Sequence, residues 1–379
     1  MRKVCFVITS HIHYARSKRI LRELRHHPEI ELQIIVGASA ILPNYGDVLR
    51  LLEADGFEAD EIITMTVEGG NPVAMSKTTG LGIIEFTTAF HNLKPDVVIV
   101  RGDRYEVLAA AVAATYLNIP VAHIEGGDVS GSIDESVRHA VTKLSHIHFT
   151  TTDQAAERVR RMGEQPDYVF NFGAPELELV TENHFEVTNE FINRIGVGDA
   201  VDLNKSFIMV IQHPVTTERD NRENIQKTLD AILELEIPTV WFWPNVDAGT
   251  DQISNAIRSF REHHNPSHIR FIKFLPAEEF LALLSKSACL VGNSSAGIKE
   301  SSYFGLPVVN IGSRQSGRAR AENVADVDYN KEQIMSAVQR QIAAGRYPSS
   351  QLYCKADTAK NIVDTISKVK LYTQKKFND

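Results

Sequence analysis

Two successive series of short apolar runs, separated by segments with helical periodicity, most strongly constrain how this chain can fold. The runs of the first series are KVCFVIT, ELQIIV, DVVIV, IPVAHI and HIHFT, at residues 3–9, 31–36, 96–100, 119–124 and 146–150. Segments with the apolar spacing of an amphipathic helix lie between them, for example at residues 17–27 and 73–93. Strands that are apolar throughout and separated by helices are typical of a parallel sheet covered on both faces.

The pattern loosens between residues 172 and 205 and then begins again. The second series comprises SFIMVIQ, PTVWFW, HIRFIKF, ACLVG and LPVVNIG, at residues 206–212, 238–243, 268–274, 288–292 and 306–312. The length of 379 residues suits two domains of ordinary size. We therefore predict an α/β protein with two Rossmann-like, doubly wound parallel-sheet domains facing a cleft, with ligands at the strand carboxyl ends. The predicted domains are residues 1–172 and 173–355, followed by a C-terminal helix at 356–379 that packs back on the first domain.

Composition narrows the class of partner. A net charge of −8 argues against nucleic acid. The N-terminal apolar run is too short for a signal peptide, and no run reaches membrane-spanning length, so we expect a cytoplasmic protein without a membrane partner. Cys5, Cys289 and Cys354 are spaced too widely for a disulfide framework or a metal motif. We expect no metal and no other cofactor, with Cys5 and Cys289 as small buried hydrophobes and His11 and His13 as surface or packing residues.

Polar side chains follow five of the predicted strands, where an open α/β sheet forms its site. They are Asp103 and Arg104, His123 and Glu125, His213, Asn245, and the turn GNSSAGIKE at residues 292–300. Several also have a purely structural interpretation: Asp103 could cap the next helix, and Asp134 could be a first-turn acid with Arg138 as its ion-pair partner. The two glycines after Glu125 favour a functional role, because they indicate a backbone that needs freedom or a close approach.

The GNSSAGIKE turn indicates a site for a nucleoside diphosphate. Its small residues leave backbone N–H groups and the hydroxyls of Ser294 and Ser295 at the start of a predicted helix, which suits an anion. Glu300, in the first turns of that helix, could accept two ribose hydroxyls. The alternative is a capped helix with an ordinary surface glutamate. The turn is neither G-x-G-x-x-G nor a P-loop, so neither a dinucleotide cofactor nor ATP is favoured.

Seven motifs, in order, carry a resemblance to a known family. They are RGDR, HIEGG, SGSIDESVRHAVTKLSHIH, QHPVTT, PNVDAG, GNSSAGIKE and GSRQSGR, at residues 101–104, 123–127, 130–148, 212–217, 244–249, 292–300 and 312–318. With them the sequence resembles the hydrolysing UDP-N-acetylglucosamine 2-epimerases of sialic-acid biosynthesis over nearly the whole chain. Those enzymes adopt the two-domain fold also used by GT-B glycosyltransferases. Their non-hydrolysing relatives typically have Ala-Gly-Leu-Arg after the strand glutamate, where this chain has GGDV.

The resemblance implies the site residues position by position. It implies Asp103, Glu125 and Asp134 as catalytic carboxylates, and His213 as a contact to the leaving diphosphate or an aid to its departure. It implies Arg138 as a residue that orients an active-site acid. The residues implied to hold UDP are Arg104, His213, Asn245, Ser294, Ser295, Glu300 and Arg314, with Glu300 on the ribose hydroxyls.

The resemblance also has one departure and one implication for assembly. The family usually has an arginine near the phosphates in the loop after the first strand, whereas this chain has His11 there, with Arg16 nearby. Arg104 and Arg314 are then expected to contribute more of the phosphate contact. A homodimer or homotetramer is implied by the family alone.

The implied reaction converts UDP-N-acetylglucosamine and water to N-acetylmannosamine and UDP. Cleavage of C1–O develops positive charge at C1, which acidifies the C2 proton, so elimination gives 2-acetamidoglucal and hydration with proton return to the opposite face inverts C2. Two-face proton transfer needs at least two acid/base groups, and which carboxylate does which stays open. The alternatives are a hydrolysing 2-epimerase of UDP-2,4-diacetamido-2,4,6-trideoxyglucose on a legionaminic-type route, a GT-B glycosyltransferase, and a catalytically silent nucleotide-sugar sensor.

Overall fold

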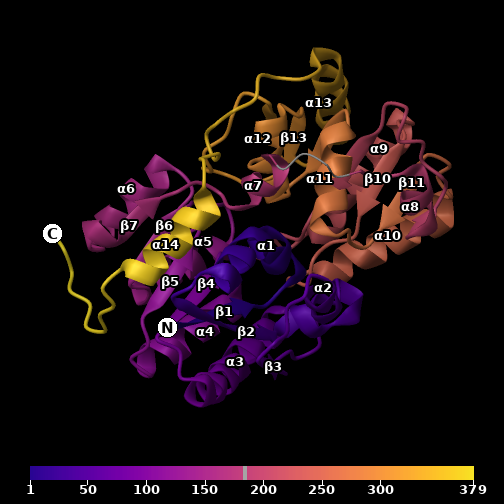
Figure 1. Ribbon diagram of the computed structural model, residues 1–379. Helices are drawn as coiled ribbons and strands as arrows, with labels where there is room; N and C mark the ends of the chain where they lie inside the picture. The colour runs from indigo at the N-terminus through magenta and orange to yellow at the C-terminus, as the bar shows by residue number, and fades with distance from the viewer. Residues whose placement is uncertain (182–185) are drawn as a thin grey trace. The chain divides into compact units, whose positions relative to one another are not determined.

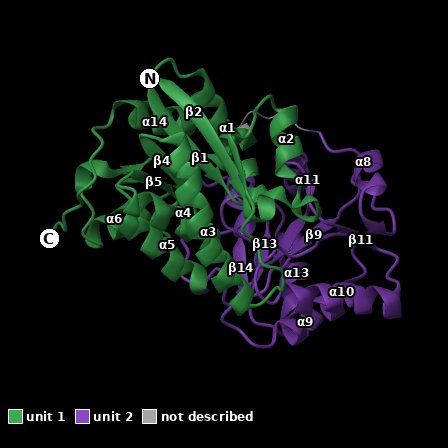
Figure 2. Ribbon diagram, turned by 90° about the horizontal axis from the view of Figure 1, so that it is seen from below, with its two compact units in different colours: residues 1–129, 133–181, 353–379 green, residues 130–132, 182–352 purple. Residues whose placement is uncertain are grey.

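The computed structural model describes residues 1–181 and 186–379 and divides into two compact units (Figures 1 and 2). Unit 1 comprises residues 1–129, 133–181 and 353–379, and unit 2 comprises residues 130–132 and 182–352. Within the described residues, no helix combines the length and apolar character needed to cross a bilayer.

Unit 1 is built on a seven-stranded parallel sheet of order β3-β2-β1-β4-β5-β6-β7. Its strands are β1 (Arg2–Ile8), β2 (Ile30–Gly37), β3 (Glu61–Ile63), β4 (Val97–Arg101), β5 (Val121–Ile124), β6 (Ile147–Thr150) and β7 (Val169–Asn171). Its helices are α1 (His11–His26), α2 (Val48–Ala54), α3 (Pro72–Leu93), α4 (Tyr105–Tyr116), α5 (Ile133–Leu144), α6 (Asp153–Arg161), α7 (Glu176–Thr181) and α14 (Thr358–Lys368), with 3-10 turns η1 (Ala38–Ile41), η2 (Pro43–Tyr45) and η3 (Pro166–Tyr168). Alternate residues of β1 enter opposite layers: Val4 and Phe6 pack with α1 and α14, and Cys5 and Val7 pack with α3 and α4.

Unit 2 repeats the design with a sheet of order β14-β13-β12-β9-β10-β11-β8, in which only β8 is antiparallel to its neighbour. Its strands are β8 (Val197–Gly198), β9 (Ile208–Ile211), β10 (Thr239–Phe242), β11 (Ile269–Ile272), β12 (Cys289–Gly292), β13 (Val308–Ile311) and β14 (Val324–Val327). Its helices are α8 (Asn189–Arg194), α9 (Asn221–Leu235), α10 (Thr250–His264), α11 (Ala277–Lys286), η4 (Ser295–Gly297), α12 (Glu300–Phe304) and α13 (Lys331–Ala344). Ile208 and Val210 of β9 pack with α9, α10 and α13, whereas Met209 and Ile211 pack on the opposite face with α8 and α11.

Both sheets reverse their strand order at one point, between β1 and β4 in unit 1 and between β9 and β12 in unit 2. In open α/β sheets, ligands bind beyond the carboxyl ends of the strands at such a reversal. The loops that follow these four strands are therefore the places to look for a site.

The predicted fold class is confirmed, because all ten predicted apolar runs contain strands and both sheets are doubly wound. Cys5 and Cys289 are fully buried in the cores, as expected. The prediction of a helix over 356–379 was wrong at both ends, since α14 begins at Thr358 and ends at Lys368. Beyond it the chain loses its apolar periodicity and is anchored by other contacts, among them the Tyr372 hydroxyl, which donates to the His146 carbonyl (3.1 Å).

Candidate active site

Two of the predicted catalytic carboxylates follow neighbouring strands of unit 1. β4 pairs with β5 in parallel, with Arg101 opposite Ile124. The pairing continues one residue further, because the Gly102 N–H donates to the Ile124 carbonyl (2.9 Å). Asp103 and Glu125 are the next residues after these two positions, so both lie at the same edge of the sheet.

A buried arginine holds Asp103. Arg138 of α5 is 1% exposed; its Nη2 donates to Asp103 Oδ2 and its Nη1 to the Asp128 carbonyl (2.9 Å). Burial alone would lower the pKa of Arg138, but the charges of Asp103, Asp128 and Asp134 outweigh it and raise the pKa above its usual value. Arg138 therefore bonds Asp103 directly, while Asp134, in the first turn of α5, acts on it through its charge.

A second buried arginine holds Glu125. Arg101, the last residue of β4, donates from Nη2 to Glu125 Oε1 (2.5 Å) and to Glu176, and from Nη1 to the Arg16 carbonyl. Burial opposes its charge, but Glu125 and Glu176 raise the pKa of Arg101. Sequence reasoning did not select Arg101 or Glu176. The only available indication was an arginine that ends an apolar strand, where a buried charge needs a partner.

The backbone at Glu125 is in an unusual conformation. Its φ is +72°, and its N–H donates to the Phe149 carbonyl (2.9 Å). A non-glycine residue in this region costs on the order of 1–3 kcal/mol and is found disproportionately at functional sites. The close approach expected at the following glycines is present: a Cβ at Gly127 would lie 2.3 Å from the Ala155 carbonyl oxygen, and one at Gly126 would lie 3.0 Å from His123 Nδ1.

A set of buried polar contacts links His123 to Asp103. His123 Nε2 donates to the Gly102 carbonyl (2.8 Å), and Nδ1 contacts the Thr142 hydroxyl (3.2 Å). The Thr142 hydroxyl also lies 3.0 Å from the carbonyl of Arg138, which binds Asp103. Burial lowers the pKa of His123 to about 4, so the ring is neutral at pH 7. Gly102, which precedes Asp103, and Arg138, which binds Asp103, are thus both held by the same buried contacts.

The first turn of α1 and the residues after β4 bring further groups to the strand reversal of unit 1. His13, predicted to be a surface or packing residue, is buried; its Nδ1 contacts the Thr9 hydroxyl (3.0 Å), and burial with Arg104 and Arg101 lowers its pKa to about 3. Arg104 forms a two-bond pair with the buried carboxylate of Glu106 (3.1 and 3.0 Å). Burial lowers the pKa of His11 to about 4. Contact of Arg104 with phosphate stays a prediction.

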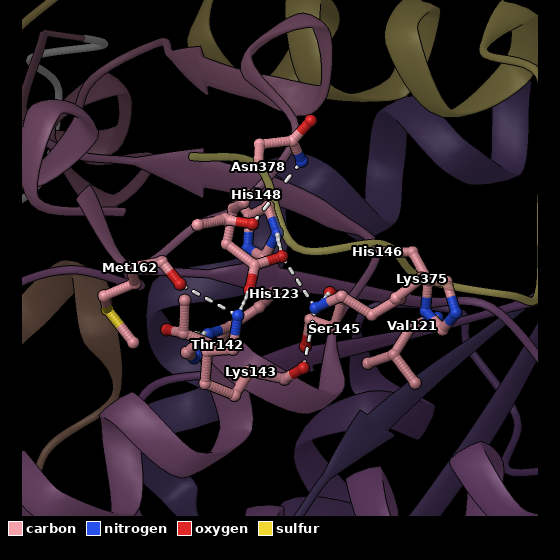
Figure 3. A network of polar contacts seen from close by, with 12 residues as sticks. Val121, His123, Thr142, Lys143, Ser145, His146, His148, Met162, Lys375 and Asn378 are labelled. Atoms are coloured by element: carbon pink, nitrogen blue, oxygen red, sulfur yellow. Dashed lines mark hydrogen bonds and ion pairs between the residues drawn. The ribbon is translucent and has the colours of Figure 1, made fainter. Parts of the chain in front are cut away.

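A buried glutamate, Glu164, anchors the C-terminal segment, and Figure 3 shows its partners Lys143, His148 and Lys375. The Glu164 carboxylate accepts hydrogen bonds from Lys143 Nζ (2.6 Å), Lys375 Nζ (2.6 Å) and His148 Nε2 (3.1 Å). His148 on β6 is directly opposite His123 on β5 in the sheet register. Sequence analysis did not find this cluster.

In unit 2, residues that follow β9 and β13 make hydrogen bonds with one asparagine, Asn293, which follows β12. The side chain of Asn293 makes two bonds with the backbone of His213: its Oδ1 accepts from the N–H (2.7 Å) and its Nδ2 donates to the carbonyl (2.9 Å). The Asn293 carbonyl accepts from Arg314 Nη1 (3.2 Å) and Gln315 Nε2 (2.9 Å). The Asn245 N–H donates to His213 Nδ1 (3.3 Å). Asn293, which sequence reasoning did not select, therefore contacts both His213 and Arg314, and Asn245 joins them through His213.

The GNSSAGIKE turn forms two short helices, where sequence reasoning expected one. Ser294 caps the single turn η4, its hydroxyl accepting from the Ala296 N–H (3.3 Å), and Glu300 begins the five-residue α12 as a buried side chain. Also within unit 2, the Gly131 N–H donates to the Arg314 carbonyl (3.0 Å). A Cβ at Gly131 would lie 1.8 Å from the Ser313 carbonyl oxygen, so only glycine fits there.

Comparison with known proteins decides the family. A model of the UDP-N-acetylglucosamine 2-epimerase family matches residues 22–367. The chain belongs to this family. Among its relatives, the UDP-N,N'-diacetylbacillosamine 2-epimerase (hydrolyzing) of Legionella pneumophila is 34% identical over 375 residues, covering 99% of this chain and 98% of that protein. The polysialic acid biosynthesis protein P7 of Escherichia coli is 30% identical over 342 residues, covering 89% of this chain and 85% of that protein.

Solved structures agree on the fold of this epimerase-family chain. The UDP-GlcNAc 2-epimerase of Neisseria meningitidis, bound to UDP-GlcNAc, superposes with a TM-score of 0.78 at 19% identity, covering 97% of this chain and 100% of that one. The UDP-GlcNAc 2-epimerase of Methanocaldococcus jannaschii, in complex with UDP-GlcNAc and UDP, superposes with a TM-score of 0.79 at 19% identity, covering 96% of this chain and 99% of that one. The resemblance inferred from the motifs is confirmed for family and GT-B-like fold. Its restriction to sialic-acid biosynthesis is not confirmed, because the relatives differ in their named roles.

Proposed function

We propose that this chain is a hydrolysing 2-epimerase that converts UDP-N-acetylglucosamine and water to N-acetylmannosamine and UDP. The observation that carries the proposal is the pair of carboxylates, Asp103 and Glu125, at adjacent strand ends, each held by a buried arginine. A UDP-binding protein without proton chemistry has no need of such a pair. Family membership and the name of the Legionella relative support the hydrolysing reaction.

In the first half of the reaction, a carboxylate of the set Asp103, Glu125 and Asp134 removes the C2 proton. The C2–H electron pair forms the C1=C2 double bond, and the C1–O pair leaves with UDP, giving 2-acetamidoglucal. In the second half, a proton is added to C2 on the opposite face, water oxygen bonds to C1, and the water proton passes to a base. Arg138 and Arg101 keep two of these carboxylates oriented, which suits groups that must meet a proton at a defined position.

Residues of unit 2 take the nucleotide in this proposal. His213 and Arg314 contact the diphosphate and stabilise the charge that develops on it as it leaves. Ser294, Ser295 and Asn245 make further contacts with UDP. Glu300 accepts hydrogen bonds from the ribose hydroxyls. Arg104 of unit 1 is proposed as a further UDP contact.

A second substrate is supported by the comparisons. UDP-2,4-diacetamido-2,4,6-trideoxyglucose differs from UDP-N-acetylglucosamine only at C4 and C6 of the sugar, and the proposed chemistry involves C1 and C2. Hydrolysing 2-epimerases of N,N'-diacetylbacillosamine nucleotides from Legionella pneumophila and Campylobacter jejuni are 34% and 28% identical to this chain. The same residues would serve either sugar.

One experiment separates the possibilities. The pure protein is incubated in D₂O with each UDP sugar, without an acceptor, and UDP and free sugar are followed by NMR. We expect UDP together with a 2-epimerised free sugar that carries deuterium at C2, and the faster substrate identifies the sugar. Release of unepimerised sugar would indicate simple hydrolysis, no consumption without an acceptor would fit a glycosyltransferase or a sensor, and either result contradicts the proposal.

A further inference from the structure

Asn293 joins the strand ends of unit 2 through every polar group it has. It is fully buried. Its N–H donates to the Ile211 carbonyl (3.0 Å), its side-chain amide makes both bonds to the His213 backbone, and its carbonyl accepts from Arg314 and Gln315. A buried amide with this many hydrogen-bond partners is fixed in one orientation, and the groups bonded to it are therefore held in fixed positions as well.

Its place in the sheet explains why it can reach these groups. Asn293 follows β12, which pairs with β9 at the reversal of strand order, with Gly292 opposite Ile211. Gly292 has φ +125°, and a Cβ there would lie 2.1 Å from the Ile211 carbonyl oxygen. Because only glycine allows this approach, the chain can turn the Asn293 amide across to the residues that follow β9.

The same network determines which nitrogen of His213 carries the proton. The Asn245 N–H points to Nδ1 of His213, and an N–H donor can only be accepted by an unprotonated ring nitrogen. The neutral ring therefore has its proton on Nε2. Since Asn293 fixes the His213 backbone, it also fixes the position at which Nδ1 meets Asn245.

We propose that Asn293 is a positioning residue for the leaving diphosphate. Its side chain fixes the backbone of His213, whose ring is then an Nε2–H donor, and its carbonyl accepts from the guanidinium of Arg314, so that a hydrogen-bond donor and a cation are presented together to a pyrophosphate group. This inference rests on the proposed function in one respect, namely that the ligand of unit 2 is a nucleoside diphosphate. Asn293 itself has no part in the proton transfers.

The first measurement needs no variant. Long-range ¹H–¹⁵N NMR of the wild-type protein reports which ring nitrogen of His213 is protonated. We expect the Nε2–H form near neutral pH, and a ring protonated on Nδ1 alone would overturn the proposal.

The second measurement uses Asn293→Ala with Asn323→Ala as the matched control. Asn323 is equally buried in unit 2, and its Nδ2 donates to the Leu306 carbonyl (2.7 Å), away from His213. The affinities of the protein for UDP, inorganic pyrophosphate and uridine are measured by calorimetry. Asn293→Ala should lower the affinity for UDP and for pyrophosphate about tenfold or more and leave the affinity for uridine unchanged, because only contacts to the charged group depend on Asn293. Asn323→Ala should leave all three affinities unchanged.

In the calorimetry, two results would overturn the proposal: unchanged UDP affinity in Asn293→Ala, or an equal loss of affinity for UDP and uridine, which a general structural role would cause. If Asn293→Ala does not fold, Asn293→Ser takes its place, and the wild-type tautomer still decides. A wild-type protein that binds UDP but releases no sugar contradicts the proposed function alone, because neither measurement depends on turnover.

Discussion

Replacement of the buried glutamate by its amide, Glu164→Gln, should release the C-terminal segment from unit 1. Glu164 is 1% exposed and accepts from Lys143, Lys375 and His148. Burial would raise its pKa, but the bonds and charges of these three partners lower it from 4.5 to about 2. At about 1.4 kcal/mol per pKa unit, that corresponds to roughly 3 kcal/mol of stabilisation of the charged form.

The sign of the pH dependence follows from the lowered pKa. The contribution of Glu164 is complete above its ordinary pKa of 4.5 and is lost as the pH falls toward 2. Glutamine cannot carry the charge at any pH. The difference between wild type and Glu164→Gln should therefore be largest at neutral pH and shrink below pH 4.5.

Hydrogen–deuterium exchange measures this locally. The Asn378 N–H donates to the Gly163 carbonyl (3.1 Å), so its protection reports whether the segment is docked. A loss of roughly 3 kcal/mol should speed its exchange by roughly a hundredfold at neutral pH, after correction for intrinsic rates. Glu157→Gln is the control, because Glu157 is 64% exposed on α6 and its pair with Arg160 is a surface pair. Exchange that is the same in Glu164→Gln, Glu157→Gln and wild type would refute the reasoning.

Further expected outcomes concern the catalytic groups and the backbone around them. Glu125→Gln keeps the volume but removes the acid/base function, so kcat should fall roughly a hundredfold to ten-thousandfold in the NMR assay. Arg138→Met should lower kcat more than it raises KM, because it frees the Asp103 carboxylate, and an unchanged kcat would contradict the positioning role. Gly127→Ala should lower the free energy of unfolding by about 2 kcal/mol or more, given φ +80° and the nearby Ala155 carbonyl. Gly80→Ala in α3, where a Cβ meets no atom within 4 Å, should instead stabilise the protein slightly in the same thermal melts.

The strand ends were predictable from the sequence because their chemistry is local. An apolar run followed within three residues by Asp103, Glu125 or His213 shows both the strand and the polar group that follows it. What the sequence did not show is which ends are neighbours, since that depends on strand order. The short strands β3, β7, β8 and β14 were missed for a related reason: they have two to four residues and lie at or beside the sheet edges, where no continuous apolar run is required.

The supporting residues were not predictable because their partners are distant in the chain. Arg101 binds Glu176, and Glu164 binds Lys375, over separations that no spacing rule covers. For His13 the sequence left open whether the residue is exposed or packed inside, and the structure shows that it is packed inside. HIHYARSK begins a helix with mixed polar residues, and in the structure His13 in the first turn of this helix lies next to Gly102 after β4, where an added Cβ would be 3.6 Å from His13 Nε2.

The arginine pairing has a consequence for the order of proton transfers. A carboxylate bonded to a buried guanidinium is stabilised in its ionised form, and the raised pKa values of Arg101 and Arg138 show the same coupling from the other side. Asp103 and Glu125 are thus suited to accept a proton rather than to supply one at the start of a turnover.

The proposed reaction removes a proton on one face of C2 and adds one on the other, so a base that has just taken the substrate proton cannot return it to the required face. The added proton must then reach the opposite-face acid from solvent within each cycle. Incorporation of deuterium at C2 of the product should for this reason be complete, and retention of the original C2 hydrogen would mean that one carboxylate serves both faces.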